Sequence, residues 1–239
     1  MDLSLRALAA LLSYPTEELR AALPEVRAAL ATPTFAPVMP ALDGLLAHLA
    51  SGDLLDRQEE YVALFDRTRS LCLNLFEHVH GDSRERGPAM VELHGIYAAA
   101  GLEPNAGELP DYLPMMLEYA AVDPARGAEL LGNAGLVIDL LHGRLAARGS
   151  PYAAALRAVL AFAGIRPSAE PPAEEPAETP ESLDAAWDEA PVTFGPGADP
   201  DAECGGAALA AKLRAARRNP NPMPARRPVL RHVAALNGG

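Results

Sequence analysis

Apolar side chains recur at helical spacing along the first two thirds of the chain. Two such stripes consist only of leucines: Leu5, Leu8, Leu11 and Leu12, then Leu42, Leu45, Leu46 and Leu49. This spacing collects side chains on one face of an α-helix, whereas a half-buried strand needs strict apolar and polar alternation. No segment alternates over enough residues to predict a strand. The pattern therefore predicts an all-α protein with one globular helical domain over residues 1–166.

Caps and prolines indicate where these helices begin and break. Thr16, followed by two glutamates, is typical of a helix N-terminus, and Pro24 should bend that helix. A further helix is expected over Leu54–Asp66, with Leu55 facing the core. Another is expected over Pro110–Ala121, because proline suits the first turn of a helix.

The composition changes after Pro167. Residues 168–180 are almost all Pro, Ala and Glu, which cannot bury enough apolar surface to offset chain entropy. From Gly205 onward the chain has one Lys, six Arg and no acid. We therefore expect residues 167–239 to be a largely disordered tail, first acidic and then basic. The apolar patch at 183–194, which contains Trp187 and Phe194, is the part suited to docking.

Charge and cysteine content restrict the class of protein. The formal net charge is −12, which disfavours nucleic acids and anionic membrane surfaces as partners of the domain but suits a basic peptide. The two cysteines, Cys72 and Cys204, are far apart and indicate no disulfide framework. No apolar run approaches the ~18 residues that a membrane span needs. The N-terminus does not match a signal peptide, so a cytoplasmic protein is expected.

The segment Phe76–Gly87, FEHVHGDSRERG, is unusually rich in ionisable side chains. Glu77, His78, His80 and Asp82 are donor types that transition metals accept, so a metal-dependent hydrolase or sensor is one hypothesis. The alternative is a polar hinge, in which His78 and His80 hydrogen-bond backbone groups in a tight turn at Gly81. Two closely spaced histidines are a weak metal signal without a second His or Cys cluster, and the hinge is favoured.

A second dense segment, Glu108–Tyr119, reads ELPDYLPMMLEY. Two carboxylates on one helix usually form a solvated face rather than an acid–base pair. The Met and Tyr side chains could instead form an adaptable apolar surface for a helical peptide, or belong to the core. The sequence leaves open which of them are core.

Three blocks together resemble a known family. YVALFDR (Tyr61–Arg67), SLCLNLFEHVHGDSRERGPAMVEL (Ser70–Leu93) and ELPDYLPMMLEY closely resemble the NarJ family of nitrate reductase assembly chaperones. Their order and spacing agree with that family, as does LDAAWDEAPVTF at 183–194. The resemblance implies the all-α chaperone fold of the TorD, DmsD and NarJ group. It also implies a non-catalytic protein with no metal or cofactor of its own.

The family resemblance also implies a function. Members bind the N-terminal leader of the nitrate reductase α subunit in the cytoplasm. They keep this subunit competent for molybdenum cofactor insertion and for assembly with its membrane anchor. Proteins that deliver the cofactor are a second class of partner that the resemblance leaves open. The residues expected to bind the client peptide are Phe76, His78, His80, Arg84, Asp111, Tyr112, Met115, Met116, Glu118 and Tyr119.

Overall fold

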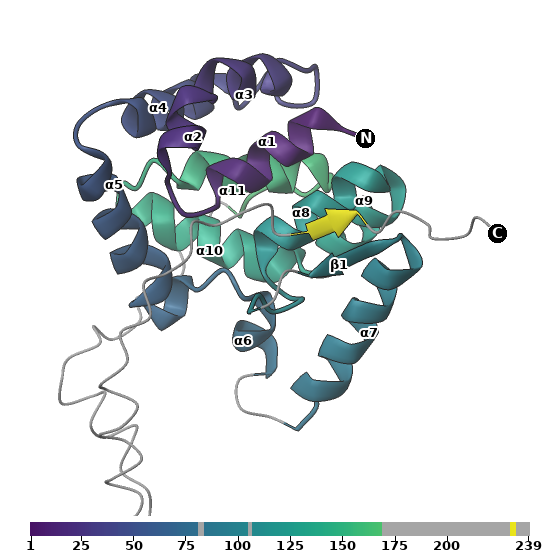
Figure 1. Ribbon diagram of the computed structural model, residues 1–239. Coiled ribbons are helices and arrows are strands. Elements are labelled where there is room, and N and C mark those ends of the chain that lie inside the picture. Colours follow the sequence, from purple (N-terminus) through teal and green to yellow (C-terminus); the bar gives the residue numbers. More distant parts are fainter. Residues whose placement is uncertain (81–83, 105–106, 169–229, 233–239) are drawn as a thin grey trace, which may run out of the picture. The chain divides into compact units, whose positions relative to one another are not determined.

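The chain folds into short helices whose boundaries follow largely from caps and prolines. The computed structural model describes residues 1–80, 84–104, 107–168 and 230–232, and it confirms the all-α prediction (Figure 1). The elements are α1 Leu3–Leu11, α2 Glu17–Ala21, α3 Leu23–Leu30, α4 Met39–Ala50, α5 Leu54–Tyr61, the π-helical turn η1 Val62–Asp66, the 3-10 turn η2 Arg69–Leu71, α6 Leu75–His80, α7 Arg86–Ala99, β1 Leu102–Pro104, α8 Leu113–Val122, α9 Pro124–Asn133, α10 Gly135–Ala147, α11 Ala153–Phe162 and β2 Leu230–His232.

The predicted helix signals act locally as expected. The Thr16 hydroxyl accepts the Leu19 N–H at 3.2 Å and caps α2. Pro24 lies in the first turn of α3, so the expected bend is a complete break between α2 and α3. The Asp123 carboxylate accepts the Arg126 N–H at 3.2 Å and caps α9, which begins at Pro124. These side chains satisfy N–H groups that the first turn of a helix leaves without partners.

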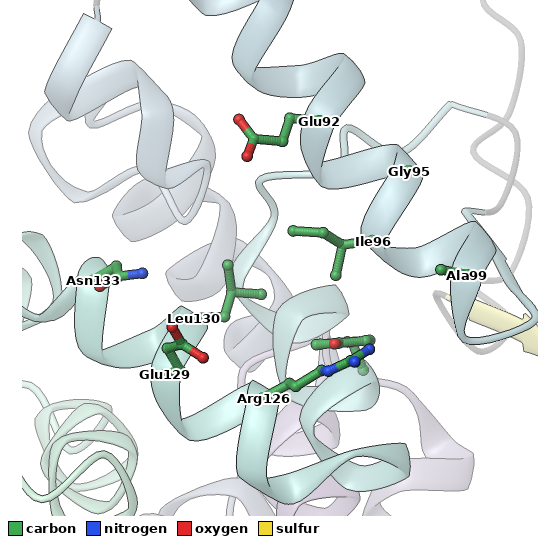
Figure 2. Close-up of a pocket in the computed structure, with 9 residues that line it drawn as sticks. Glu92, Gly95, Ile96, Ala99, Arg126, Glu129, Leu130 and Asn133 are labelled. Atoms are coloured by element: carbon green, nitrogen blue, oxygen red, sulfur yellow. The ribbon is translucent and has the colours of Figure 1, made fainter.

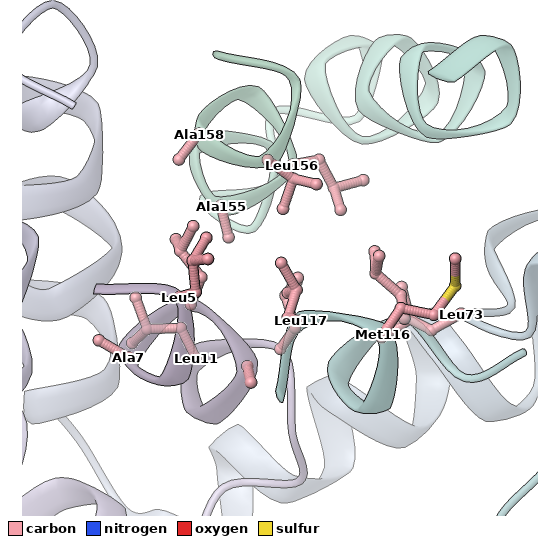
Figure 3. Close-up of a cluster of buried hydrophobic side chains, with 14 of the residues drawn as sticks. Leu5, Ala7, Leu11, Leu73, Met116, Leu117, Ala155, Leu156 and Ala158 are labelled. Atoms are coloured by element: carbon pink, nitrogen blue, oxygen red, sulfur yellow. The ribbon is translucent and has the colours of Figure 1, made fainter. Parts of the chain in front are cut away.

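The core is centred on α1, α8 and α11. Both leucine stripes are buried, and α1 packs against α3, α8 and α11. Figure 3 shows Leu5 and Leu11 of α1, Leu117 of α8 and Leu156 of α11 in one cluster. Burying each such side chain contributes roughly 1.5–3 kcal/mol. The position of α8 inside this core determines which of its residues a partner can reach.

Buried tyrosines link the core to the later segments. The Tyr61 hydroxyl donates to the Leu12 carbonyl at 2.9 Å and lies 2.9 Å from the Tyr112 hydroxyl. Because a hydroxyl has one proton, Tyr112 must donate to Tyr61. The chain satisfies two buried hydroxyls in this way and ties the end of α1 to the segment before α8.

Two local expectations were wrong. Leu55 is 58% exposed, because Leu54 is the residue that lies seven positions, two helical turns, before the buried Tyr61. The helix predicted to begin at Pro110 begins at Leu113, with Pro114 in its first turn. The tight turn expected at Gly81 lies outside the described residues, and His78, which lies on α6, bonds a backbone carbonyl as expected.

A short pair of strands was not expected from the sequence. β1 pairs antiparallel with β2, with Leu102 opposite His232 and Pro104 opposite Leu230. Three residues are too few for apolar alternation to be recognised, and the partner is more than a hundred residues away. Within the tail expected at 167–239, the described residues are 167, 168 and 230–232; the apolar patch at 183–194 lies outside them. The described residues all belong to one compact unit.

The α8 and α9 helices approach each other closely at Gly127. A Cβ atom built on Gly127 would lie 2.3 Å from the Ala120 Cβ and 2.4 Å from its Cα. Backbone cannot move aside as a flexible side chain can, so only glycine fits here. Gly132 on the same helix has no atom within 4 Å of its Cβ position. The sequence of α9 therefore fixes its distance from α8.

We predict opposite effects on stability at these two glycines. Gly127→Ala should lower the free energy of unfolding by about 1–3 kcal/mol, because the added methyl group overlaps with Ala120. Gly132→Ala should raise it by roughly 0.5–1 kcal/mol, because alanine has the higher helix propensity and the space is open. Urea unfolding of both variants measures these changes, and equal stability of the two would contradict the close packing of α8 on α9.

Candidate functional site

Asp111 joins the two segments that the sequence singled out, FEHVHGDSRERG and ELPDYLPMMLEY. It is completely buried, and its main-chain carbonyl accepts the Leu75 N–H at 3.1 Å. Its carboxylate accepts the Phe76 N–H at 3.0 Å and the Asn74 side-chain amide at 3.2 Å. The carboxylate thus caps the N-terminus of α6 from a position 35 residues away.

Backbone contacts continue this junction. The Leu113 N–H donates to the Leu73 carbonyl at 2.9 Å, and Asn74 forms an isolated antiparallel bridge with Tyr112. The first turn of α8 and the segment before α6 are therefore held edge to edge. The two motifs form one structural unit rather than two separate sites.

Burial changes the acid–base properties of Asp111. Removal from water raises the pKa of its carboxyl above the ordinary value of 3.8. The hydrogen bonds from Asn74 and Phe76 and the positive charge of Arg86 lower the pKa and oppose this effect. A carboxylate with this environment serves to hold α6. Asp111 was expected among the residues that bind the client peptide, but it is not exposed to one.

The described part of the proposed metal cluster has other partners. Glu77 forms an ion pair with Arg86 at 3.1 Å, and His78 Nε2 lies 2.8 Å from the Cys72 carbonyl. Because a carbonyl only accepts, Nε2 carries the proton there. The His80 ring packs edge-on against Phe76, with ring centroids 5.5 Å apart. Asp82 lies outside the described residues, and among those described no three His, Cys, Asp or Glu side chains gather as a metal site.

Cys72 is not suited to act as a nucleophile. Burial, with smaller contributions from Glu77 and Asp111, raises the pKa of its thiol to about 11, against the lowering effect of Asn74. The thiol is therefore protonated at neutral pH, whereas reactive cysteines are thiolates. The geometry around α6 gives no support to the hydrolase alternative.

The structure resolves which residues of ELPDYLPMMLEY are core. Met115 and Met116 are 0% and 1% exposed, and Tyr112 is also buried. They cannot form an exposed apolar floor for a peptide, because α8 is packed on most of its surface. Glu118 is half-buried. Phe76, His78 and His80 are partly exposed, and Arg84 is exposed.

Tyr119 alone of this segment lines a groove, which runs between α7 and α9. The groove has a volume of about 470 Å³ and is lined by Glu92, Gly95, Ile96, Ala99, Tyr119, Arg126, Glu129, Leu130 and Asn133. Figure 2 shows Ile96 and Leu130 extending from the two helices into the space between them. Gly95 and Ala99, one helical turn apart on α7, leave the space open because their side chains are small or absent.

The walls of this groove carry charge of both signs. Glu92 on α7 and Glu129 on α9 are both exposed, as is Arg126. Arg126 lies 3.7 Å from the Asp123 carboxylate, so part of its charge is already balanced within α9. Burial and Asp123 raise the pKa of the Tyr119 hydroxyl, while Arg126 lowers it. The groove thus has an apolar interior and a predominantly acidic border.

Sequence reasoning missed every other residue of this groove. None of the residues from α7 or α9 was among those expected to bind the client. The available signal was the pair of small residues at Gly95 and Ala99, since small side chains at helical spacing allow close approach of another group.

We predict that Asp111 contributes to stability through hydrogen bonds. Asp111→Ala should lower the free energy of unfolding by about 1–3 kcal/mol, because it leaves the buried Phe76 N–H unpaired. A raised folded-state pKa means that the folded chain binds this proton more tightly than the unfolded chain does. This tighter binding of the proton stabilises the folded state. The stabilisation is fully present below pH 3.8 and is lost as pH rises through the pKa of Asp111 in the folded protein.

The pH dependence supplies a second measurement. Asp111→Asn has no ionisable group, so wild type should lose stability relative to this variant as pH rises from about 3.5 to 7, measured by urea unfolding. Asp56→Asn, the same change at an exposed position of α5, is the matched control. Wild-type stability in Asp111→Ala would show that the carboxylate does not hold α6.

No described helix has the length and apolar character that crossing a membrane requires.

Comparison with known proteins identifies the family. The family model described as nitrate reductase delta subunit matches residues 16–158. The probable nitrate reductase molybdenum cofactor assembly chaperone NarW of Escherichia coli K12 is 41% identical over 161 residues, which cover 65% of this chain and 70% of the relative. The nitrate reductase molybdenum cofactor assembly chaperone NarJ of the same strain is 39% identical over 180 residues, 73% of this chain and 75% of the relative.

The match to a more distant relative covers nearly the whole length of that relative. The probable nitrate reductase molybdenum cofactor assembly chaperone NarJ of Bacillus subtilis 168 is 34% identical over 177 residues, which cover 71% of this chain and 94% of the relative. The family match includes α2 to most of α11 and therefore both the Asp111 junction and the groove. The chain belongs to the nitrate reductase delta subunit family, that of the NarJ and NarW molybdenum cofactor assembly chaperones.

Proposed function

We propose that this protein binds the N-terminal leader of a nitrate reductase α subunit in the groove between α7 and α9. By holding that segment in the cytoplasm, it keeps the subunit competent for molybdenum cofactor insertion and for assembly with its membrane anchor. The protein has no catalytic role in this proposal. The observation that carries it is an open apolar groove with acidic borders in a chain whose relatives are assembly chaperones.

The size of the groove limits what part of a client enters it. A helix with its side chains is about 10–12 Å across, so a space of about 470 Å³ admits anchor side chains from one face rather than a whole helix. Ile96 and Leu130, which are partly exposed, would contact these anchors. An amphipathic helix presents such anchors at spacings of three and four residues.

Charge complementarity supports a basic client. Glu92 and Glu129 border the groove from opposite walls, and the whole chain has a formal net charge of −12. Basic residues beside the anchors of a leader would meet these two carboxylates. We further propose that Phe76, His80 and Arg84, which precede α7, extend the site along this helix. His78 contributes indirectly, because its bond to Cys72 holds α6 in place.

We predict that filling the groove prevents binding. A Cβ atom on Gly95 would have no neighbour within 4 Å, so Gly95→Leu should fold normally and occupy the space that an anchor needs. Calorimetry with a synthetic peptide of the α-subunit leader should show at least about tenfold weaker binding, which corresponds to about 1.4 kcal/mol. Gly44→Leu on α4, also with open space at its Cβ, is the control and should bind as wild type does. Unchanged affinity in Gly95→Leu would place the site elsewhere.

Removing the acidic border should have a different effect. Glu92→Gln combined with Glu129→Gln should slow association with the leader peptide and flatten its dependence on salt, because rim charges act mainly on the association rate. Glu25→Gln combined with Glu59→Gln, at exposed positions of α3 and α5, removes the same net charge elsewhere. If both pairs changed association equally, overall charge rather than the groove would be responsible. Stopped-flow measurements at several salt concentrations distinguish these results.

A further inference from the structure

The edge of β1 is covered by the chain's own C-terminal segment. Leu102–Pro104 pair antiparallel with Leu230–His232, and Glu103 lies opposite Arg231. A strand edge presents backbone N–H and C=O groups that any extended segment can pair with. The pairing here extends over three residues, and Pro104 has no N–H to donate. Two short strands are marginally stable, so this contact is suited to exchange.

The strand pair lies next to the groove. β1 follows α7 through Gly101, whose φ of 73° ends the helix, and Ala99 at that end lines the groove. β2 also contacts α8, the helix that contributes Tyr119 to the groove. Figure 1 shows the yellow strand β2 beside β1 at the C-terminal end of α7. A segment that occupies the β1 edge therefore borders the site proposed for the client.

The occupying segment has the chemistry expected of a client. Its sequence from Arg226, RRPVLRHVA, contains three arginines and no acid, with Val and Leu between them. Addition of an extended peptide to a free strand edge is a common way to bind peptides, and backbone hydrogen bonds supply much of the affinity. A tethered segment also competes at a high effective concentration.

We propose that the β1 edge is a strand-addition site for basic, extended segments, which the chain's own residues 230–232 occupy until a basic segment of a client displaces them. The displacement by a client rests on the proposed function, whereas the strand-addition site does not. The same protein would then bind its client more tightly when its own strand is weakened.

The strand-addition site is tested first without any client. The full-length variants Arg231→Pro and Arg231→Ala both remove the charge, but only Pro removes the N–H and disfavours a strand. Successive N–H groups of a strand point to opposite sides, so one of the Leu102 and Glu103 amides faces β2, and hydrogen exchange at that amide should be faster in Arg231→Pro than in wild type and Arg231→Ala. A synthetic peptide of residues 226–234 should bind Arg231→Pro at least about tenfold more tightly than it binds wild type. Equal exchange, or equal binding of this peptide by all three proteins, overturns the proposal.

The α-subunit leader peptide then tests displacement. It should bind Arg231→Pro more tightly than wild type, with Arg231→Ala close to wild type. Equal affinity for all three proteins would overturn displacement by a client. If the leader binds none of them while the 226–234 peptide binds Arg231→Pro, the proposed function fails and the strand-addition site stands.

Discussion

The carboxylate of Asp111 is the contact on which the arrangement of the later helices depends. It lies out of water, and transfer of a charge from water is costly, so burial raises its pKa; the Phe76 N–H and the Asn74 amide, from another part of the chain, offset part of that cost. The Asp111 carboxylate fixes where α6 begins and holds α6 against the segment that leads into α8. Since α7 follows α6 and Tyr119 lies on α8, this one junction positions both the groove wall and its floor.

Local sequence signals predicted much of the fold, because helix formation depends on near neighbours. Thr16 caps α2, Pro24 separates α2 from α3, and the leucines of α1 and α4 are buried as their spacing indicated. Leu55 was expected to face the core because it is apolar, but its spacing from the buried Tyr61 places it on another face of the helix. The strand β1 could not be predicted, since its partner is supplied by a distant segment.

The candidate site was less predictable than the fold, and the reason is tertiary packing. Asp111, Met115 and Met116 have the residue types of a peptide-binding surface, but the same types fill a core when a helix is covered on most sides. Only Tyr119 of that helix reaches the groove, because α9 crosses next to it. Ile96 and Leu130 come from helices whose sequence patterns say nothing about each other. A pocket between elements needs their relative placement, which local patterns do not contain.

The contact between Gly127 and Ala120 has a consequence for the mechanics of the groove. It seats α9 directly on α8, and α9 also packs against α10 and α11, so this wall is anchored on three sides. The opposite wall, α7, buries Leu93 and Tyr97 in fourteen residues, and the element it packs against most closely is β1. Helices with few buried contacts open at low free energy. An occupant that required a wider groove would therefore displace α7 more easily than α9.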